Sequence, residues 1–225
     1  MNHAALTLTA AAALLLLAST SSARANVEAG QGGASLDLGN LTDTAESIMN
    51  QLTEQAATVD LSTAGQNIAA FLQLLKQSEG TASSGDPYAV TYGYGHTIQN
   101  FSDHPAITGE WTGKVLPPEM CKNAGFGPGC KSTAAGAYQI IRPTWLTVKN
   151  ALGLSDFSPS SQDAAAVELL RRRGALEDVK AGRIAAAIQK SRNEWASLPG
   201  NYAGQGQHHI NTLLGWFETA GGTFA

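Results

Sequence analysis

The sequence has few charged residues and only two cysteines. Asp, Glu, Lys and Arg together make up 14% of its 225 residues, and the formal net charge is -4. A surface that binds nucleic acid needs clustered Lys and Arg to displace counterions, so this balance excludes a general polyanion binder. Hydrophobic residues reach 43%, which is enough to bury a core. We therefore expect one globular domain and no nucleic-acid partner.

The N-terminal segment has an apolar run that is too short to cross a membrane comfortably. The run extends from Ala10 to Ala18, and the small-x-small pattern Ala23-Arg24-Ala25 follows it. A comfortable span needs roughly 20 apolar residues. This pattern predicts a signal peptide over residues 1–25 and an exported protein. The alternative is an uncleaved export anchor that associates transiently with the membrane through residues 4–18.

The two cysteines are separated by a turn-rich stretch. Cys121 and Cys130 flank KNAGFGPG. In an exported protein such a pair predicts a disulfide that closes this loop. The alternative, half of a zinc site, lacks the second CxxC or the paired His that tetrahedral zinc requires.

Residues 26–62 have a different composition from the rest of the chain. Residues 26–40 are Gly-rich and have no periodicity, which predicts a flexible spacer. Apolar residues then recur at helical spacing over 41–57 and predict an amphipathic helix. This helix either binds a partner or packs on the domain as an added element. We place the folded domain at residues 63–225.

The domain reads as mainly helical. Ile68, Phe71, Leu72 and Leu75 share one helix face, and Gly80 predicts the end of that helix. Residues 88–97, YAVTYGYGHT, predict a short β-hairpin. After Gly136 we expect helices that start near Pro143 and Pro159, and further helices at 184–195 and 207–220.

Glu79 is the candidate for proton transfer. A carboxyl in phase with a buried helix face, at the C-terminal end of that helix, is desolvated and lies near the negative end of the dipole. Both effects raise its pKa and favour the protonated acid, which a general acid needs near neutral pH. The pattern alone favours the alternative that Glu79 simply reaches solvent at a helix end, since a glutamate there is common.

Seven blocks, in one order, resemble a known family between Phe71 and Gly222. They are FLQLLKQSEGT, FSDHP, KSTAAGAYQI, LGLSDFSPSSQD, RRRGAL, WASLPG and ETAGGT. The chain is similar here to the lambda-type endolysins, which are lysozyme-like lytic transglycosylases. The resemblance implies an α+β, mainly α fold, in which a small β-hairpin lobe and a helical lobe flank a sugar-binding cleft. It also implies that Glu79 is the catalytic glutamate.

A second likeness concerns the sugar cleft. Gly136-Ala137-Tyr138-Gln139-Ile140 with Pro143-Thr144 resembles the Gly-Leu-Met-Gln-Ile and Pro-x-Thr signature of soluble lytic transglycosylases. Tyr138 then packs against a sugar face and Gln139 bonds an acetamido or hydroxyl group. The alternative for Tyr138 is core packing. Further candidates for substrate contact are Ser132, Thr133 and Tyr92.

The resemblance implies a reaction on peptidoglycan glycan strands in the periplasm or cell envelope of a Gram-negative host. Glu79 alone cleaves the β-1,4 bond between N-acetylmuramic acid and N-acetylglucosamine and leaves a 1,6-anhydromuramoyl end. One alternative is a hydrolytic muramidase, which needs a second carboxylate such as Asp86, Asp103 or Glu110. We interpret these as loop acids. Another alternative is a catalytically weak module that binds the wall.

The chain departs from the lambda-type relatives in two places. Where they read Tyr-Asp-Val-Ile-Val-Gly-Gly, residues 88–94 read YAVTYGY, so one acid is lost and aromatic residues are gained. Residues 106–130 form an insertion that contains Trp111 and the cysteine loop, which could form a different lip over the cleft. His96, Asp103 and His104 fit no metal motif, so we expect no metal and no cofactor.

Overall fold

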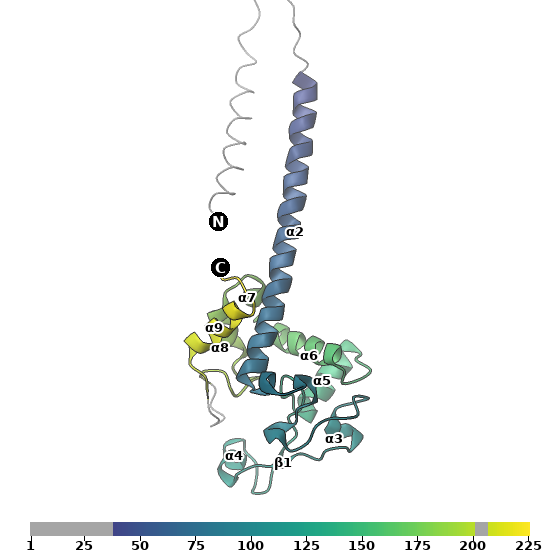
Figure 1. Cartoon of the computed structure of the whole chain (residues 1–225), viewed down its shortest axis with the longest axis vertical. Coiled ribbons are helices and arrows are strands. Elements are labelled where there is room, and N and C mark those ends of the chain that lie inside the picture. The colour runs from purple at the N-terminus through teal and green to yellow at the C-terminus, as the bar shows by residue number, and fades with distance from the viewer. Residues whose placement is uncertain (1–37, 201–206) are drawn as a thin grey trace, which may run out of the picture. The chain divides into compact units, whose positions relative to one another are not determined.

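The computed structural model describes residues 38–200 and 207–225 (Figure 1). The predicted signal peptide and most of the spacer, residues 26–37, lie outside the described residues. The chain divides into two compact units, residues 1–51 and 52–225. In the first unit the described residues are the helical residues 38–51. All the elements described below, apart from the start of α2, belong to the second unit.

The first described element is α2, Leu38–Ser78. The two helices predicted over 41–57 and 68–79 both fall within it. A role of residues 41–57 in binding a partner stays a prediction. Phe71, Leu74 and Leu75 are fully buried in the core of the second unit. The helix ends where predicted, because Gly80 adopts a left-handed conformation with φ 77°.

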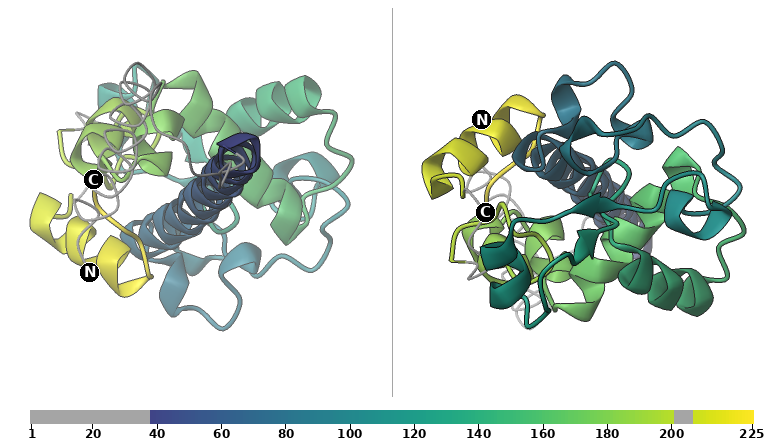
Figure 2. Two further views of the ribbon diagram at one scale, coloured as in Figure 1. Left: turned by 90° about the horizontal axis from the view of Figure 1, so that it is seen from above. Right: turned by 90° about the horizontal axis from the view of Figure 1, so that it is seen from below.

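The helices of the C-terminal half lie around the end of α2 (Figure 2). Asn67 fixes α2 to them, because its side-chain amide donates to Lys180 O at 3.2 Å and to Thr223 O at 3.0 Å. The caps agree with the sequence prediction: Ser158 Oγ accepts from Ser161 N at the start of α6. The helices are α5 (Arg142–Leu152), α6 (Pro159–Arg172), α7 (Leu176–Lys180), α8 (Ile184–Ser191) and α9 (Ile210–Thr219).

The small antiparallel β part exists, but its strands lie within the insertion and directly after it, and not at residues 88–97. Strand β1 (Lys114–Val115) pairs with β2 (Lys131–Ser132), and α3 (Pro105–Thr108) and α4 (Pro118–Asn123) belong to the same stretch of chain. The prediction of a hairpin at 88–97 is wrong, since only two isolated bridges form there, between Val90 and Thr97 and between Thr91 and Ala135. Gly93 and Tyr94 have left-handed backbones that interrupt extended structure. This region instead contains the 3₁₀ turns η2 (Thr81–Ser83), η3 (Pro87–Ala89) and η4 (Tyr92–Tyr94).

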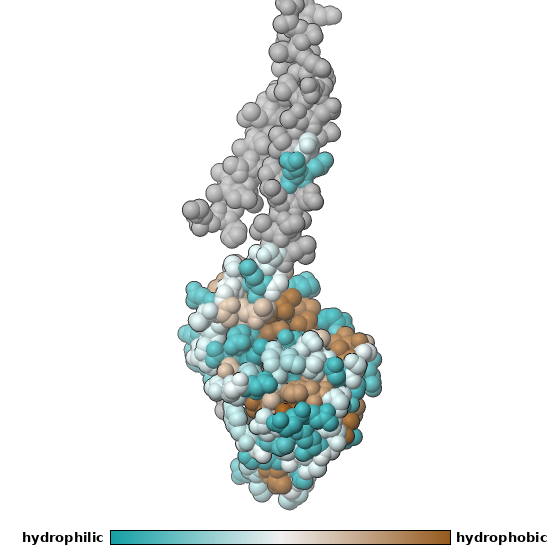
Figure 3. All heavy atoms as spheres, turned by 45° about the vertical axis from the view of Figure 1, so that its right-hand side comes forward, coloured by the Kyte–Doolittle hydropathy of each residue, from teal (hydrophilic) through white to brown (hydrophobic). Residues whose placement is uncertain are grey.

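Aromatic residues fill the core of the second unit. Trp145 meets Phe157 edge to face, with ring centroids 4.7 Å apart, and His104 meets the same Phe157 at 5.0 Å. On the face shown in Figure 3, hydrophobic residues lie in separate patches between hydrophilic ones. Within the described residues, no helix is both long enough and apolar enough to span a membrane.

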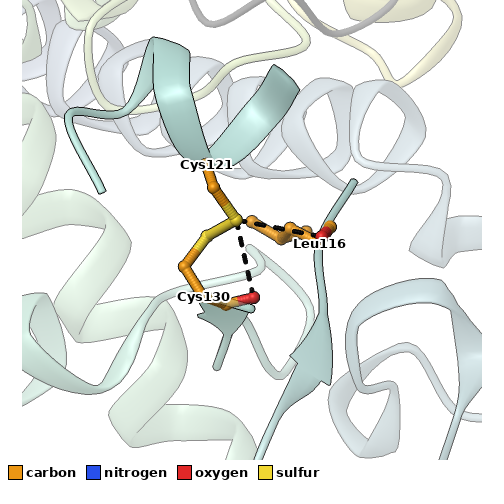
Figure 4. Close-up of a disulfide and its surroundings, with 3 residues drawn as sticks. All are labelled: Leu116, Cys121 and Cys130. Carbon is orange, nitrogen blue, oxygen red and sulfur yellow. Dashed lines mark hydrogen bonds between the residues drawn. A yellow bond between two sulfur atoms is a disulfide. The ribbon is translucent and has the colours of Figure 1, made fainter. Parts of the chain in front are cut away.

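The predicted disulfide between Cys121 and Cys130 is confirmed (Figure 4). Cys121 lies on α4 and is fully buried, while Cys130 directly precedes β2. Their Cα atoms are 5.7 Å apart. The bond therefore fixes α4 to the base of the short sheet and closes the Gly-rich loop between them.

Candidate active site

Glu79 follows the last residue of α2 and is half-buried. Ser197 Oγ donates to Glu79 Oε1 at 2.6 Å. The hydroxyl of the preceding residue, Ser78, lies 2.7 Å from Ser197 Oγ. With Ser197 as donor to the carboxyl, Ser78 donates to Ser197. Ser78 thus holds Ser197, and Ser197 holds one oxygen of Glu79, while the other oxygen has no hydrogen bond to the described residues and can carry the proton.

Burial raises the pKa of Glu79 from 4.5 to about 7. Desolvation of the carboxylate is the larger effect, and the hydrogen bond from Ser197 acts in the opposite direction by stabilising the charged form. A carboxyl with this pKa is protonated in about half of the molecules near neutral pH. It can therefore both give and take a proton there.

Glu79 opens into a cavity of about 150 Å³. Two predicted substrate-contact residues, Tyr92 and Gln139, line this cavity together with Glu79. Ser197 and Tyr94 also line it, and the sequence analysis did not single them out, although Ser197 belongs to the conspicuous WASLPG block. The full lining is Ser78, Glu79, Val90, Thr91, Tyr92, Gly93, Tyr94, Gln139 and Ser197.

A tight turn brings Gln139 into the cavity wall. Gln139 has φ 48°, and its backbone N–H and side-chain amide both donate to Gly136 O, at 3.1 and 3.0 Å. Gly136 has φ 76° and has no room for a Cβ, which would collide with Gln162 Oε1. That same oxygen accepts from Ala137 N at 2.9 Å. Glycine at position 136 is therefore required for the turn itself.

Tyr138 lies in the core and not on the cavity. Its side chain is 1% exposed, and its hydroxyl donates to Asp163 Oδ1 at 2.5 Å. Burial, followed by the nearby Asp163 carboxylate, strongly raises its pKa. Since the ring is covered by protein, the structure supports core packing for Tyr138 over the sugar contact that its motif suggested.

Ser132 and Thr133 also lie outside the cavity lining. Ser132 belongs to β2, where it pairs with Lys114, and its Oγ accepts from Ala134 N at 3.3 Å. Thr133 Oγ1 accepts from Arg142 N at 3.0 Å. Ser132 thus bonds the backbone just after β2 and Thr133 bonds the first residue of α5, and the structure does not bring them together with Glu79.

Three acids were candidates for a second catalytic carboxylate. Each of them forms hydrogen bonds or an ion pair elsewhere in the structure. Asp86 Oδ1 accepts from Tyr88 N at 3.0 Å and caps η3. Asp103 is paired with Lys149 at 2.6 Å and accepts from Trp145 Nε1 at 2.8 Å. Desolvation opposes these bonds, but together they lower the pKa of Asp103.

Glu110 is held in the same way. Its Oε1 lies 2.8 Å from His96 Nε2 and accepts from Gln99 N at 2.7 Å. These bonds outweigh desolvation and lower the pKa of Glu110. None of the three acids lines the cavity. Among the described residues that do, Glu79 is the only carboxylate, and residues 201–206, NYAGQG, contribute none by sequence.

The two histidines of the metal hypothesis each have a local partner. His96 is bound to Glu110. His104 Nδ1 accepts from Ala106 N at 3.1 Å, and Nε2 lies 3.0 Å from Ile140 O, to which it donates. Burial lowers the pKa of His104 to about 4, so it is neutral near pH 7. Over the described ranges, no three His, Cys, Asp or Glu side chains come together as metal ligands.

The chain is similar to known proteins over this same region. A family model described as Endolysin matches residues 69–224. The endolysin of Escherichia phage P2 is 42% identical over 157 residues, which cover 70% of this chain and 94% of that protein. The endolysin of Escherichia phage lambda is 39% identical over 159 residues, which cover 68% of this chain and 90% of the relative.

Solved structures agree with the sequence relatives. Bacteriophage lambda lysozyme complexed with a chitohexasaccharide has a TM-score of 0.59 and 38% identity, and the match covers 71% of this chain and 97% of that one. A second structure of lysozyme from bacteriophage lambda gives a TM-score of 0.58 at 36% identity, with the same coverage. These matches confirm the lysozyme-like fold. Because the family model covers more than half of the sequence and each relative is matched over most of its length, the chain belongs to the Endolysin family.

Proposed function

We propose that the chain is a peptidoglycan lytic transglycosylase in which Glu79 acts first as the acid and then as the base. As a member of the Endolysin family it is a lysozyme-like enzyme that degrades peptidoglycan. The proposal concerns the reaction by which it does so. The observation that carries it is that Glu79 is the only carboxylate among the described residues of the cavity.

Each step of the proposed reaction uses the same carboxyl. Protonated Glu79 gives its proton to the glycosidic oxygen between N-acetylmuramic acid and N-acetylglucosamine, and the bond from that oxygen to C1 of the muramic acid breaks. The C6 hydroxyl of the muramic acid then bonds to C1 and returns its proton to Glu79. The product is a 1,6-anhydromuramoyl end, and no water is consumed.

The electrostatics of Glu79 support both halves of this cycle. A pKa of about 7 keeps a large fraction of Glu79 protonated for the first half and makes its carboxylate basic enough for the second. An ordinary glycosidase divides these roles between two carboxyl groups. A hydrolytic muramidase would need another group to activate water, and Asp86, Asp103 and Glu110 bond elsewhere.

The relatives support a glycan as the ligand of the cavity. Lambda lysozyme has been solved in complex with a chitohexasaccharide. We propose that Tyr92 and Gln139, which line the cavity of this chain, contact the sugar. A side-chain amide and a phenol hydroxyl suit the acetamido and hydroxyl groups of N-acetylated sugars.

Mass spectrometry of the muropeptides released from purified peptidoglycan tests the proposal. The variant Glu79→Gln keeps the shape of the side chain but cannot give a proton at pH 7, so anhydromuramoyl products should disappear. Glu218→Gln, on the exposed side of α9, is the matched control and should release the same products as the parent. Reducing ends from the parent would instead identify a hydrolase, and no products at all would identify a wall-binding module.

We also propose that the chain acts in the periplasm or cell envelope after export directed by residues 1–25. The apolar run and the Ala-Arg-Ala pattern support this proposal. Phage endolysins act on the cell wall, and a chain made in the cytoplasm has to reach it. N-terminal sequencing of the exported protein should find a start near Asn26, whereas an intact Met1 would mean that the segment is an uncleaved anchor.

A further inference from the structure

Tyr94 is an aromatic residue exposed at the edge of the catalytic cavity. Its side chain is 62% exposed, although it lines the same cavity as Glu79. An aromatic ring buries a large apolar area when it finds a partner, and leaving it in water forgoes that stabilisation. With this much of its surface open, the Tyr94 side chain is available to a ligand that enters the cavity.

The backbone at Tyr94 is in a conformation that glycine adopts more easily. Tyr94 has φ 53°, and Gly93 before it has φ 64°. A non-glycine residue held there is strained, and such residues cluster at ligand sites. The corresponding position in the lambda-type motif is glycine. This chain thus carries a large ring on a left-handed turn, at a position where that motif has glycine.

The segment that carries the ring is held firmly. The Tyr94 hydroxyl donates to Gly80 O at 2.5 Å, which joins it to the residue directly after Glu79. Lys114 Nζ donates to Gly93 O at 3.3 Å, and Tyr92 N donates to Ala134 O at 2.9 Å. Because the ring is already fixed relative to the end of α2, a ligand that packs on it loses little free energy in ordering it.

We propose that the Tyr94 ring is a platform for one pyranose ring of an N-acetylated glycan strand, next to the bond that Glu79 cleaves. The C–H faces of a pyranose are apolar while its edge carries hydroxyl and acetamido groups. A flat aromatic surface beside polar groups such as Gln139 matches that chemistry. This inference rests on the proposed function only in taking a glycan as the ligand. It holds whether the enzyme is a transglycosylase or a hydrolase.

Binding of an N-acetylglucosamine hexamer to the full chain carrying Glu79→Gln tests the platform, because that variant binds without cleavage. Adding Tyr94→Ala removes the ring and should raise Kd by about ten-fold, the scale of one aromatic contact. Adding Tyr94→Phe keeps the ring but removes the bond to Gly80, and Kd should stay near that of the parent. Phe126→Ala removes another exposed aromatic residue, 66% exposed and outside the cavity lining, and should change nothing.

Three outcomes would overturn the platform. An unchanged Kd for Tyr94→Ala would mean that the ring makes no contact. Equal weakening by Tyr94→Phe and Tyr94→Ala, with a matching fall in Tm, would mean that the hydroxyl only ties the turn to α2. Failure of the Glu79→Gln parent to bind the hexamer would mean that a glycan of this type is not the ligand of the cavity. The muropeptide products of the active enzyme decide the transglycosylase proposal separately.

Discussion

At the scale of single residues, the hydroxyl of Ser197 opposes the effect of burial on the pKa of Glu79. It donates to the carboxylate at 2.6 Å, and this bond lowers the pKa that burial has raised. Without the hydroxyl, Glu79 should hold its proton to a higher pH. Since the rate falls as Glu79 loses that proton, Ser197→Ala should move the alkaline limb of the pH–rate profile upward by roughly one pH unit. Clearing of purified peptidoglycan, followed from about pH 5 to 9, measures this.

The matched control is another buried serine. Ser191 Oγ donates to Ala187 O at 2.7 Å within α8, so Ser191→Ala removes the same atom without touching Glu79. Its alkaline limb should coincide with that of the parent. If both variants lower the rate equally and leave the limb in place, Ser197 supports only the fold and has no effect on proton transfer.

At the scale of elements, the turn from Gly136 to Gln139 depends on the absence of a side chain at its first residue. A Cβ on Gly136 would meet both Gln162 and Phe157, and φ 76° adds backbone strain. We expect Gly136→Ala to lower the free energy of unfolding by roughly 2–4 kcal/mol, and to lower activity by displacing Gln139. Urea unfolding measures the first effect and clearing of peptidoglycan the second.

Gly127→Ala is the matched substitution for that prediction. A Cβ there meets nothing within 4 Å, and no left-handed φ is involved. Its free energy of unfolding should stay within about 0.5 kcal/mol of the parent. A Gly136→Ala variant equally close to the parent would show that Gln162 moves aside and that the turn tolerates a side chain.

The sequence predicted the ends of helices that are fixed by residues within one turn of the chain. It did not predict elements whose formation depends on residues far away in the sequence. Ser158 and Pro159 mark the start of α6, and Gly80 the end of α2, because a cap and a left-handed glycine act within one turn. The prediction of a hairpin at 88–97 was wrong. Its β-branched and aromatic residues favour strands, but the left-handed backbone at Gly93 and Tyr94 interrupts the extended conformation.

The candidate site likewise has residues that local sequence patterns predict and residues that they do not. Glu79 follows from a helix phase and a family motif, both readable along the chain. Ser197 reaches it from 118 residues away, so no spacing rule connects the two. Tyr138 shares the motif of Gln139, yet the turn sends one side chain into the core and the other to the cavity. Which face each one takes depends on tertiary packing against Asp163 and Gln162.

At the scale of the whole molecule, the region that matches the endolysins leaves out the N-terminal part of the chain. The family model matches residues 69–224, and the P2 endolysin is covered over 94% of its own length by a match of 157 residues. The relative thus consists almost entirely of the region that contains Glu79 and its cavity. The N-terminal region of this chain carries the predicted export segment and the predicted helix over 41–57, which have no part in that cavity among the described residues.

A fragment of residues 63–225 should therefore fold and clear purified peptidoglycan at a rate comparable to that of the full chain. It keeps Asn67, whose bonds to Lys180 O and Thr223 O hold the end of α2 in the domain. Expressed in the cytoplasm, the same fragment should not lyse its host, because it lacks residues 1–25. A fragment start at residue 82 would remove Glu79 with α2 and serves as the inactive control. Lysis by the 63–225 fragment from within would show that another route carries it to the wall, and loss of clearing in vitro would show that residues before 63 belong to the catalytic domain.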